Sequence, residues 1–148
     1  MQSFIFTSLS GWSLVVLTGI SVSLALAFRR QLRDPKFRLR WEKGRIFLKR
    51  MRPHYWLGYA IAGITLVHAA LALSSGWAKG ANILGLMLAG LGMFLVFAQI
   101  LLGRTLRRPH TPNRRQLRGL HLVLMFIIVT LGVGHILLDS STLHSLLR

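Results

Sequence analysis

The sequence predicts an all-α membrane protein, a bundle of four transmembrane helices that forms a single domain over residues 1–148. Hydrophobic residues make up 53% of the chain and its mean hydropathy is +0.53, a composition typical of membrane proteins. Acidic residues number three against 19 Lys and Arg. Four apolar stretches are each long enough to cross a bilayer, which takes about 20 residues.

The four predicted spans are joined by polar connections. They are roughly Thr7–Phe28, His54–Leu73, Asn82–Gly103 and Leu120–Leu138. Backbone N–H and C=O groups in lipid must bond within their own segment, so each span is predicted to be a helix. Pro53 precedes the second span and is expected in the first turn of that helix, where a missing N–H is harmless. No positively charged stretch precedes the first span, so we expect a retained helix rather than a cleaved signal peptide.

The net charge of +16 is concentrated in two of the connections. Residues 29–52 contain 11 Lys or Arg and residues 104–118 contain six, which leaves only Lys79 and Arg148 elsewhere. By the positive-inside rule both basic connections are cytoplasmic and both termini lie outside, as in a multi-pass protein of a bacterial inner membrane. The expected surroundings are therefore membrane lipid, and no nucleic-acid partner is expected. The absence of cysteine excludes disulfides, thiolate metal sites and covalent haem attachment.

Histidine recurs in one pattern on the second and fourth spans. His54 and His68 are fourteen residues apart, and so are His121 and His135. Fourteen helical residues rise about 21 Å and make four turns at about 3.5 residues per turn, so in a left-handed bundle both rings of one helix point to the same side. The two spans run in the same direction. His54 and His121 are therefore expected at one depth near the inner face, and His68 and His135 at another near the outer face.

Two opposed imidazoles are the axial ligands that a haem iron can take. If the second and fourth spans face each other, His54 and His121 ligate the iron of an inner haem b, and His68 and His135 that of an outer haem b. A single membrane histidine is more often a hydrogen-bond partner or a proton relay. Two matched pairs favour two haems held between the second and fourth helices.

Other residues are weaker candidates. Gly58 and Gly134 leave room for a flat macrocycle beside the histidines, although glycine more often serves helix packing. Gln99 is an isolated polar residue in the third span, placed either for a quinone or haem ligand or for a plain interhelical hydrogen bond. His110 and His144 lie in polar segments, where we expect solvated side chains.

Haem propionates would need cations near each membrane face. Arg52 and Arg118 are the candidates for the inner haem, and Lys79 is the candidate for the outer one. The alternative for each is that the charge only sets membrane topology.

The stretches "RPHYWLGYAIAGITLVHAALAL" and "RRQLRGLHLVLMFIIVTLGVGHILL", with a glycine-rich helix between them, resemble the ferric reductase-like transmembrane domain. That domain is related to the di-haem b-type membrane cytochromes, and the resemblance covers about residues 49–138. It implies two b haems stacked across the membrane on the four matched histidines, with electrons passing between the faces. Reductases of this family usually carry a flavin- and nicotinamide-binding domain. The sequence has no dinucleotide-binding glycine fingerprint, so a redox partner protein or quinol is expected to supply the electrons.

The leading interpretation is thus an electron-transfer subunit of a larger oxidoreductase. Two other functions stay open. One is a haem-free carrier of protons or divalent metal, since intramembrane histidines suit both tasks, although the spans lack the carboxylates that a metal path usually has. The other is a membrane anchor subunit whose haem is structural.

Overall fold

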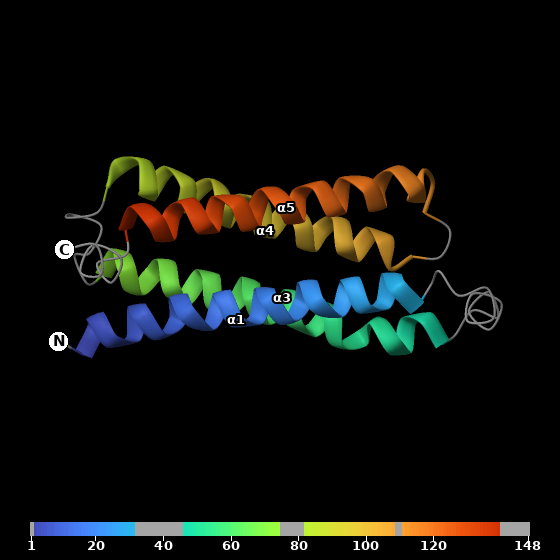
Figure 1. Ribbon diagram of the computed structural model, residues 1–148, viewed down its shortest axis with the longest axis horizontal. Coiled ribbons are helices and arrows are strands. Elements are labelled where there is room, and N and C mark those ends of the chain that lie inside the picture. Colours follow the sequence, from blue (N-terminus) through green and yellow to red (C-terminus); the bar gives the residue numbers. More distant parts are fainter. Residues whose placement is uncertain (1, 32–45, 75–81, 109–110, 140–148) are drawn as a thin grey trace. The chain divides into compact units, whose positions relative to one another are not determined.

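The computed structural model describes residues 2–31, 46–74, 82–108 and 111–139, which are almost entirely helical (Figure 1). The helices are α1 (Gln2–Gln31), α3 (Ile46–Ser74), α4 (Ile83–Leu106) and α5 (Arg114–Asp139). No strand occurs within these described ranges. Each helix contains a segment of 23 to 25 residues that is long and apolar enough to cross a membrane. The predicted all-α architecture with four membrane-spanning helices is confirmed, and the chain is an integral multi-pass membrane protein.

The chain divides into two units, Met1–His68 and Ala69–Arg148. In the first, α1 and the larger part of α3 lie side by side and run antiparallel (Figure 1). We call this pair the N-terminal hairpin. In the second, α4 and α5 pack against each other in the same antiparallel manner, and we call them the C-terminal hairpin. Each hairpin therefore carries two of the four predicted ligand histidines on its second helix.

Three helices begin earlier than the hydropathy of the sequence predicts. α1 starts at Gln2 instead of Thr7, α3 at Ile46 instead of His54, and α5 at Arg114 instead of Leu120. Pro53 consequently lies inside α3, and the expectation that it occupies the first turn is wrong. The apolar stretch locates the membrane, whereas helical hydrogen bonding continues into the flanking basic residues, because Lys, Arg, Leu and Met are all good helix formers.

The C-terminal hairpin has well-defined helix ends. Asn82 caps the start of α4, where its Oδ1 accepts a hydrogen bond from the Leu84 N–H at 2.9 Å. Before α5, Asn113 adopts a left-handed conformation with φ 54°, which asparagine tolerates better than most residues. The Arg114 guanidinium donates to the carbonyl oxygens of Leu106 at 2.9 Å and Arg108 at 3.5 Å. This side chain binds the carbonyl end of α4 and so ties the two helices together.

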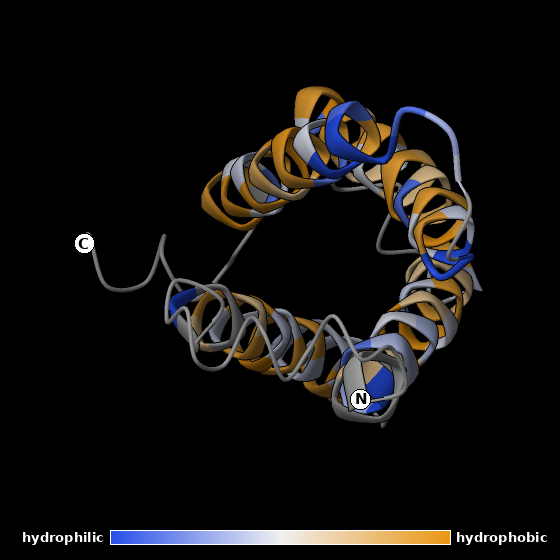
Figure 2. Ribbon diagram, turned by 90° about the vertical axis from the view of Figure 1, so that its right-hand side faces the viewer, coloured by the Kyte–Doolittle hydropathy of each residue, from blue (hydrophilic) through white to orange (hydrophobic). Residues whose placement is uncertain are grey.

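The described residues bury very little apolar surface. Ala62, at 7% exposed, is the sole buried hydrophobic residue among them, whereas Trp56 is 65% and Phe94 68% exposed. α4 and α5 are hydrophobic over most of their length (Figure 2). A soluble protein would not leave such surfaces in water. A lipid bilayer solvates them, which is the environment that the composition predicts.

Candidate functional site

His68 of α3 is held by the first turns of α1. Its Nδ1 lies 3.1 Å from the Thr7 carbonyl oxygen and 3.0 Å from Ser10 Oγ. The Ser10 hydroxyl itself donates to the Thr7 carbonyl at 2.9 Å. A carbonyl oxygen can only accept, and the Ser10 proton is already directed at that carbonyl, so both contacts require a proton on Nδ1. In this neutral tautomer the ring lone pair is on Nε2.

His54, near the other end of α3, has a related contact with α1. Its Nδ1 lies 3.2 Å from Ser21 Oγ. A hydroxyl can donate or accept, so this contact is compatible with either tautomer of the ring. Thr7 and Ser21 are the two buried polar residues of the described chain, at 5% and 8% exposed. These two buried polar residues of α1 thus lie at the two histidines of α3, Ser21 through its hydroxyl and Thr7 through its backbone carbonyl.

The spacing of these contacts is regular. Thr7 and Ser21 are fourteen residues apart, like the histidines that they contact, so α1 and α3 keep one antiparallel register across the hairpin. The sequence interpretation assigned no ligand residue to the first span. The structure adds a hydrogen-bonding role. Because Thr7 contacts His68 through its backbone carbonyl, and the serines Ser10 and Ser21 are not at the histidine spacing, the sequence carries no clear signal of this role.

The C-terminal hairpin holds its histidines through the backbone. The His135 Nδ1 lies 3.2 Å from the carbonyl oxygen of Gly85, a buried residue in the first turn of α4. This contact again requires a proton on Nδ1 and a lone pair on Nε2. At the other end the Gln99 side chain donates from Nε2 to the backbone carbonyl of His121 at 2.9 Å. The plain interhelical hydrogen bond that the sequence left open for Gln99 is therefore present.

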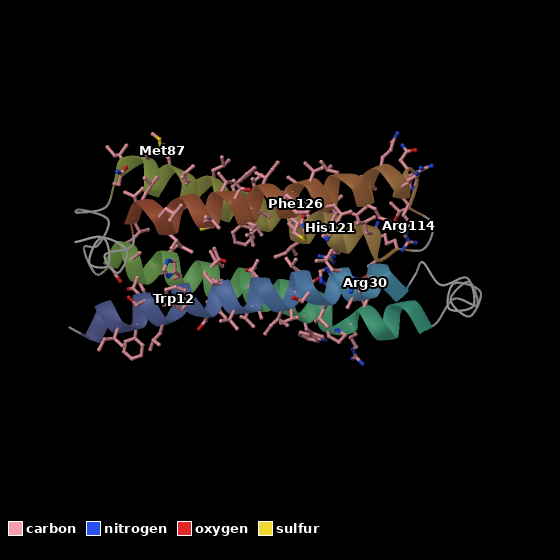
Figure 3. The ribbon with its side chains drawn as sticks, viewed as in Figure 1. Trp12, Arg30, Met87, Arg114, His121 and Phe126 are labelled. Carbon is pink, nitrogen blue, oxygen red and sulfur yellow. The ribbon has the colours of Figure 1, made fainter. Side chains whose placement is uncertain are left out.

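The register of the second hairpin repeats that of the first. Gly85 and Gln99 are fourteen residues apart, and so are His135 and His121. His121 and Arg114 lie on the side of α5 that faces α4, which agrees with their contacts to it (Figure 3). The Gln99 Oε1 atom is buried without a hydrogen-bond partner in the described part of the chain. Both hairpins thus have interhelical contacts fourteen residues apart, but at His121 the contact reaches the backbone and not the ring.

Glycines bring helices close to two of the imidazoles. A Cβ added at Gly11 would lie 3.2 Å from His68 Cε1, and one added at Gly103 would lie 3.5 Å from His121 Cε1. Gly58 behaves differently, because a Cβ there would meet no atom within 4 Å. The role of Gly58 beside a macrocycle stays a prediction.

Gly134 serves packing between helices. A Cβ added at this residue would lie 3.0 Å from Leu88 Cδ1 of α4. The space beside Gly134 is therefore filled by a leucine. Of the two functions considered for this glycine, close helix packing is the one observed.

The predicted propionate-binding cations are only partly described. The side chains of Arg52 and Arg118 are exposed, and Lys79 lies outside the described residues, as do His110 and His144. The propionate role of all three cations stays a prediction. Within the described ranges no group of three or more His, Asp or Glu side chains is close enough to hold a metal ion. A bis-histidine haem requires only two such side chains per iron.

Comparison of the chain with protein-family models, with curated proteins and with solved structures gives no match. Whether the chain fits a haem thus rests on its own residues. A histidine that ligates a metal usually donates its other ring N–H to a carbonyl or hydroxyl, which fixes the tautomer and the ring orientation. His68 and His135 have this arrangement, with Nδ1 bound to a carbonyl of the neighbouring helix. The ring orientations of His68 and His135 suit haem ligands, and the pairing of histidines from the two hairpins stays a prediction.

Proposed function

We propose that the chain is a di-haem b-type cytochrome that carries electrons across a membrane as a subunit of a larger redox system. His54 and His121 would ligate one iron, and His68 and His135 the other. The observation that carries the proposal is the pair of contacts from His68 and His135 to backbone carbonyls. Both rings are thereby set to present Nε2, fourteen residues from a second histidine on the same helix.

These contacts favour a ligand over a proton relay. A relay histidine takes a proton on one ring nitrogen and releases one from the other. A backbone carbonyl cannot receive the proton that the Nδ1 atom of His68 or His135 holds. Rings fixed in this way are suited to a stationary role, in which orientation and basicity matter more than exchange.

A bound haem b supplies a one-electron Fe(III)/Fe(II) couple, and two histidine ligands leave no open iron position for oxygen chemistry. The contribution of the protein is to hold the imidazoles, exclude water and set the potential. Terminal chemistry would then belong to a redox partner protein or to a quinone. On the same proposal Arg52 and Arg118 bind the propionates of an inner haem and Lys79 those of an outer one.

The proposed orientation follows the distribution of charge. Both basic connections would face the cytoplasm and both termini the outside, as in a bacterial inner membrane. Cysteine accessibility in intact cells tests this, since the chain has no native cysteine. A cysteine introduced at Ser75 should react with a membrane-impermeant reagent, and one introduced at Arg108 should not.

The direct test of function is the haem-to-protein ratio of the purified chain, with a reduced-minus-oxidised visible spectrum. The wild type should carry two haems, both low-spin in the ferric state. H54A and H121A should each lose the same haem, identified by its midpoint potential, and H68A and H135A should each lose the other.

H110A and H144A are matched controls, because they remove histidines outside the predicted spans. Both variants should retain two haems. A wild-type preparation without haem, although haem is supplied during expression, would reject the proposal. In that case proton or metal uptake into liposomes by the haem-free chain becomes the function to measure. Loss of both haems with partner assembly and turnover intact would instead indicate an anchor subunit with structural haem.

A further inference from the structure

We propose that α1 is a positioning helix, in which Ser10 and Ser21 set the orientation and basicity of His68 and His54 and thereby tune one haem each. The inference rests on the proposed function for the tuning of haem. Its structural part, the control of the two imidazoles, stands on the contacts of α1 alone.

The first support is the match between buried polar groups and ring nitrogens. Apolar residues dominate α1, and a hydroxyl buried in a membrane helix is costly unless it is hydrogen-bonded. Ser21 is 8% exposed and its Oγ lies 3.2 Å from His54 Nδ1. Ser10 Oγ lies 3.0 Å from His68 Nδ1. Both hydroxyls therefore lie at Nδ1, and Nε2 is the ring nitrogen that would ligate iron.

The second support is the direction of the hydrogen bonds at His68. The ring N–H faces Ser10 Oγ and the Thr7 carbonyl, and the Ser10 O–H also donates to that carbonyl. The three groups form a chain in which each donor has an acceptor. An acceptor at Nδ1–H makes the imidazole a stronger electron donor through Nε2. Such a ligand stabilises the ferric state and lowers the midpoint potential.

The two ends of α1 differ in how firmly they fix the tautomer. At His68 the carbonyl allows a proton on Nδ1 only, so the ligating tautomer exists before any iron arrives. At His54 the Ser21 contact by itself is compatible with either tautomer.

The test uses S10A and S21A in the full chain, with S13A and S23A as matched controls. Ser13 is three residues from Ser10, but its hydroxyl bonds to the Leu9 carbonyl of its own helix at 2.8 Å. Ser23 is two residues from Ser21 and is exposed. All four variants remove one hydroxyl from α1, and only S10A and S21A remove a contact to a histidine.

The first measurement is redox potentiometry. S10A should raise the midpoint potential of the haem that H68A loses, and S21A that of the haem that H54A loses, with the other potential unchanged. The affinity for the affected haem should fall by about 10- to 100-fold, the usual effect of removing an outer hydrogen-bond partner of a metal ligand. In S10A the fall in haem affinity should be at the low end of this range, because the Thr7 carbonyl still accepts a hydrogen bond from His68. S10T and S21T retain a hydroxyl and should restore wild-type values.

The second measurement does not require haem. Histidine ¹⁵N chemical shifts of the full chain, with any bound haem kept reduced and diamagnetic, distinguish Nδ1–H from Nε2–H rings. His68 should be Nδ1–H in the wild type, and its Nδ1 signal should move in S10A but not in S13A. His135, bound to a carbonyl of α4, is an internal reference that should not move.

The outcomes separate the two proposals. A wild type without haem, in which S10A still moves the His68 signal, would reject the cytochrome and retain the positioning role of α1. Two haems whose potentials are the same in S10A, S21A and the control variants, with unmoved His68 signals, would reject the positioning role and retain the cytochrome. Failure of S10T and S21T to restore the potentials would also count against a hydroxyl contact.

Discussion

The two hairpins hold their histidines in the same register by different groups. In the N-terminal hairpin the contacts to Nδ1 come from side-chain hydroxyls of α1, together with one carbonyl. In the C-terminal hairpin the Gly85 carbonyl contacts His135 Nδ1 at one end, whereas at the other end the Gln99 side chain donates to the backbone carbonyl of His121 and not to its ring. Buried polar groups in membrane helices need a partner on a neighbouring helix. These contacts lie fourteen residues apart in each hairpin, although Gln99 Oε1 is left without a partner among the described residues.

The two hairpins differ in how easily a substitution can change the contacts of their histidines. A hydroxyl contact is removed or replaced by a single substitution, whereas a carbonyl contact is common to every residue type. The N-terminal hairpin can therefore be tuned by sequence changes in α1. In the C-terminal hairpin the Gly85 contact to His135 depends on how closely α4 and α5 approach, which small residues such as Gly85 and Gly103 allow. The Gln99 contact at His121 reaches the backbone and not the ring.

The same substitution in the two hairpins should have unequal effects. An Ala Cβ at position 11 would lie 3.2 Å from His68 Cε1, and one at position 103 would lie 3.5 Å from His121 Cε1. The shorter distance requires the imidazole to move, and two contacts to Nδ1 resist that movement. We expect G11A to destabilise the folded state by about 1–3 kcal/mol, the usual cost of overpacking, and to reduce occupancy of the haem that H68A loses. G103A should stay within about 0.5 kcal/mol of wild type, since its contact is an ordinary one.

Unfolding in mixed micelles with increasing SDS measures these free energies, and the visible spectrum measures occupancy. G19A and G119A are the controls, because a Cβ at either residue meets no atom within 4 Å. Equal losses in G11A and G103A would show that the two hairpins tolerate close contacts alike. The prediction that G11A destabilises the protein more than G103A would then be wrong.

A smaller effect is expected at the packing contact of the C-terminal hairpin. A Cβ at position 134 would lie 3.0 Å from Leu88 Cδ1. That atom is the end of a flexible side chain, so a change of rotamer relieves most of the overlap. G134A should cost at most about 1 kcal/mol, at the low end of overpacking effects. The same substitution should cost less in an L88A background, and a double-mutant cycle in SDS unfolding measures the coupling. A cycle without coupling would mean that the two residues do not touch.

The sequence predicts much of this architecture because hydropathy and charge act over whole helices. The sequence locates the four described helices, and α4 starts within one residue of the predicted boundary, Asn82. The starts of α1, α3 and α5 are misplaced, since hydropathy reports where lipid begins and not where helical hydrogen bonding begins. Pro53 therefore lies within α3 instead of in its first turn.

The candidate site is less visible in the sequence. The four histidines stand out by their spacing, but their hydrogen-bond partners do not. The Gly85 carbonyl has no sequence signature, because every residue carries one. Ser10 and Ser21 are two of several serines in α1, and only their register with α3 distinguishes them from Ser13 and Ser23. The pairing of His54 with His121 and of His68 with His135 still rests on the predicted membrane depths.

The smallest effect is expected at Gln99, whose side chain contacts the backbone of a histidine in the C-terminal hairpin. Replacement by Leu removes the hydrogen bond from Nε2 to the His121 carbonyl. It also removes Oε1, which is buried without a partner among the described residues. Losing a bond of this kind in a membrane protein costs about 0.6 kcal/mol on average, and removing an unsatisfied acceptor recovers part of that cost. Q99L should therefore remain within about 0.5 kcal/mol of wild type in SDS unfolding, with both haem potentials unchanged. Q99E is the informative companion, because its carboxylate cannot donate to the carbonyl and should destabilise the hairpin clearly. If Q99L alone shifts a haem potential as far as S21A does, Gln99 positions His121 as the serines position the histidines of α3, and the distinction between a side-chain-held and a backbone-held hairpin fails.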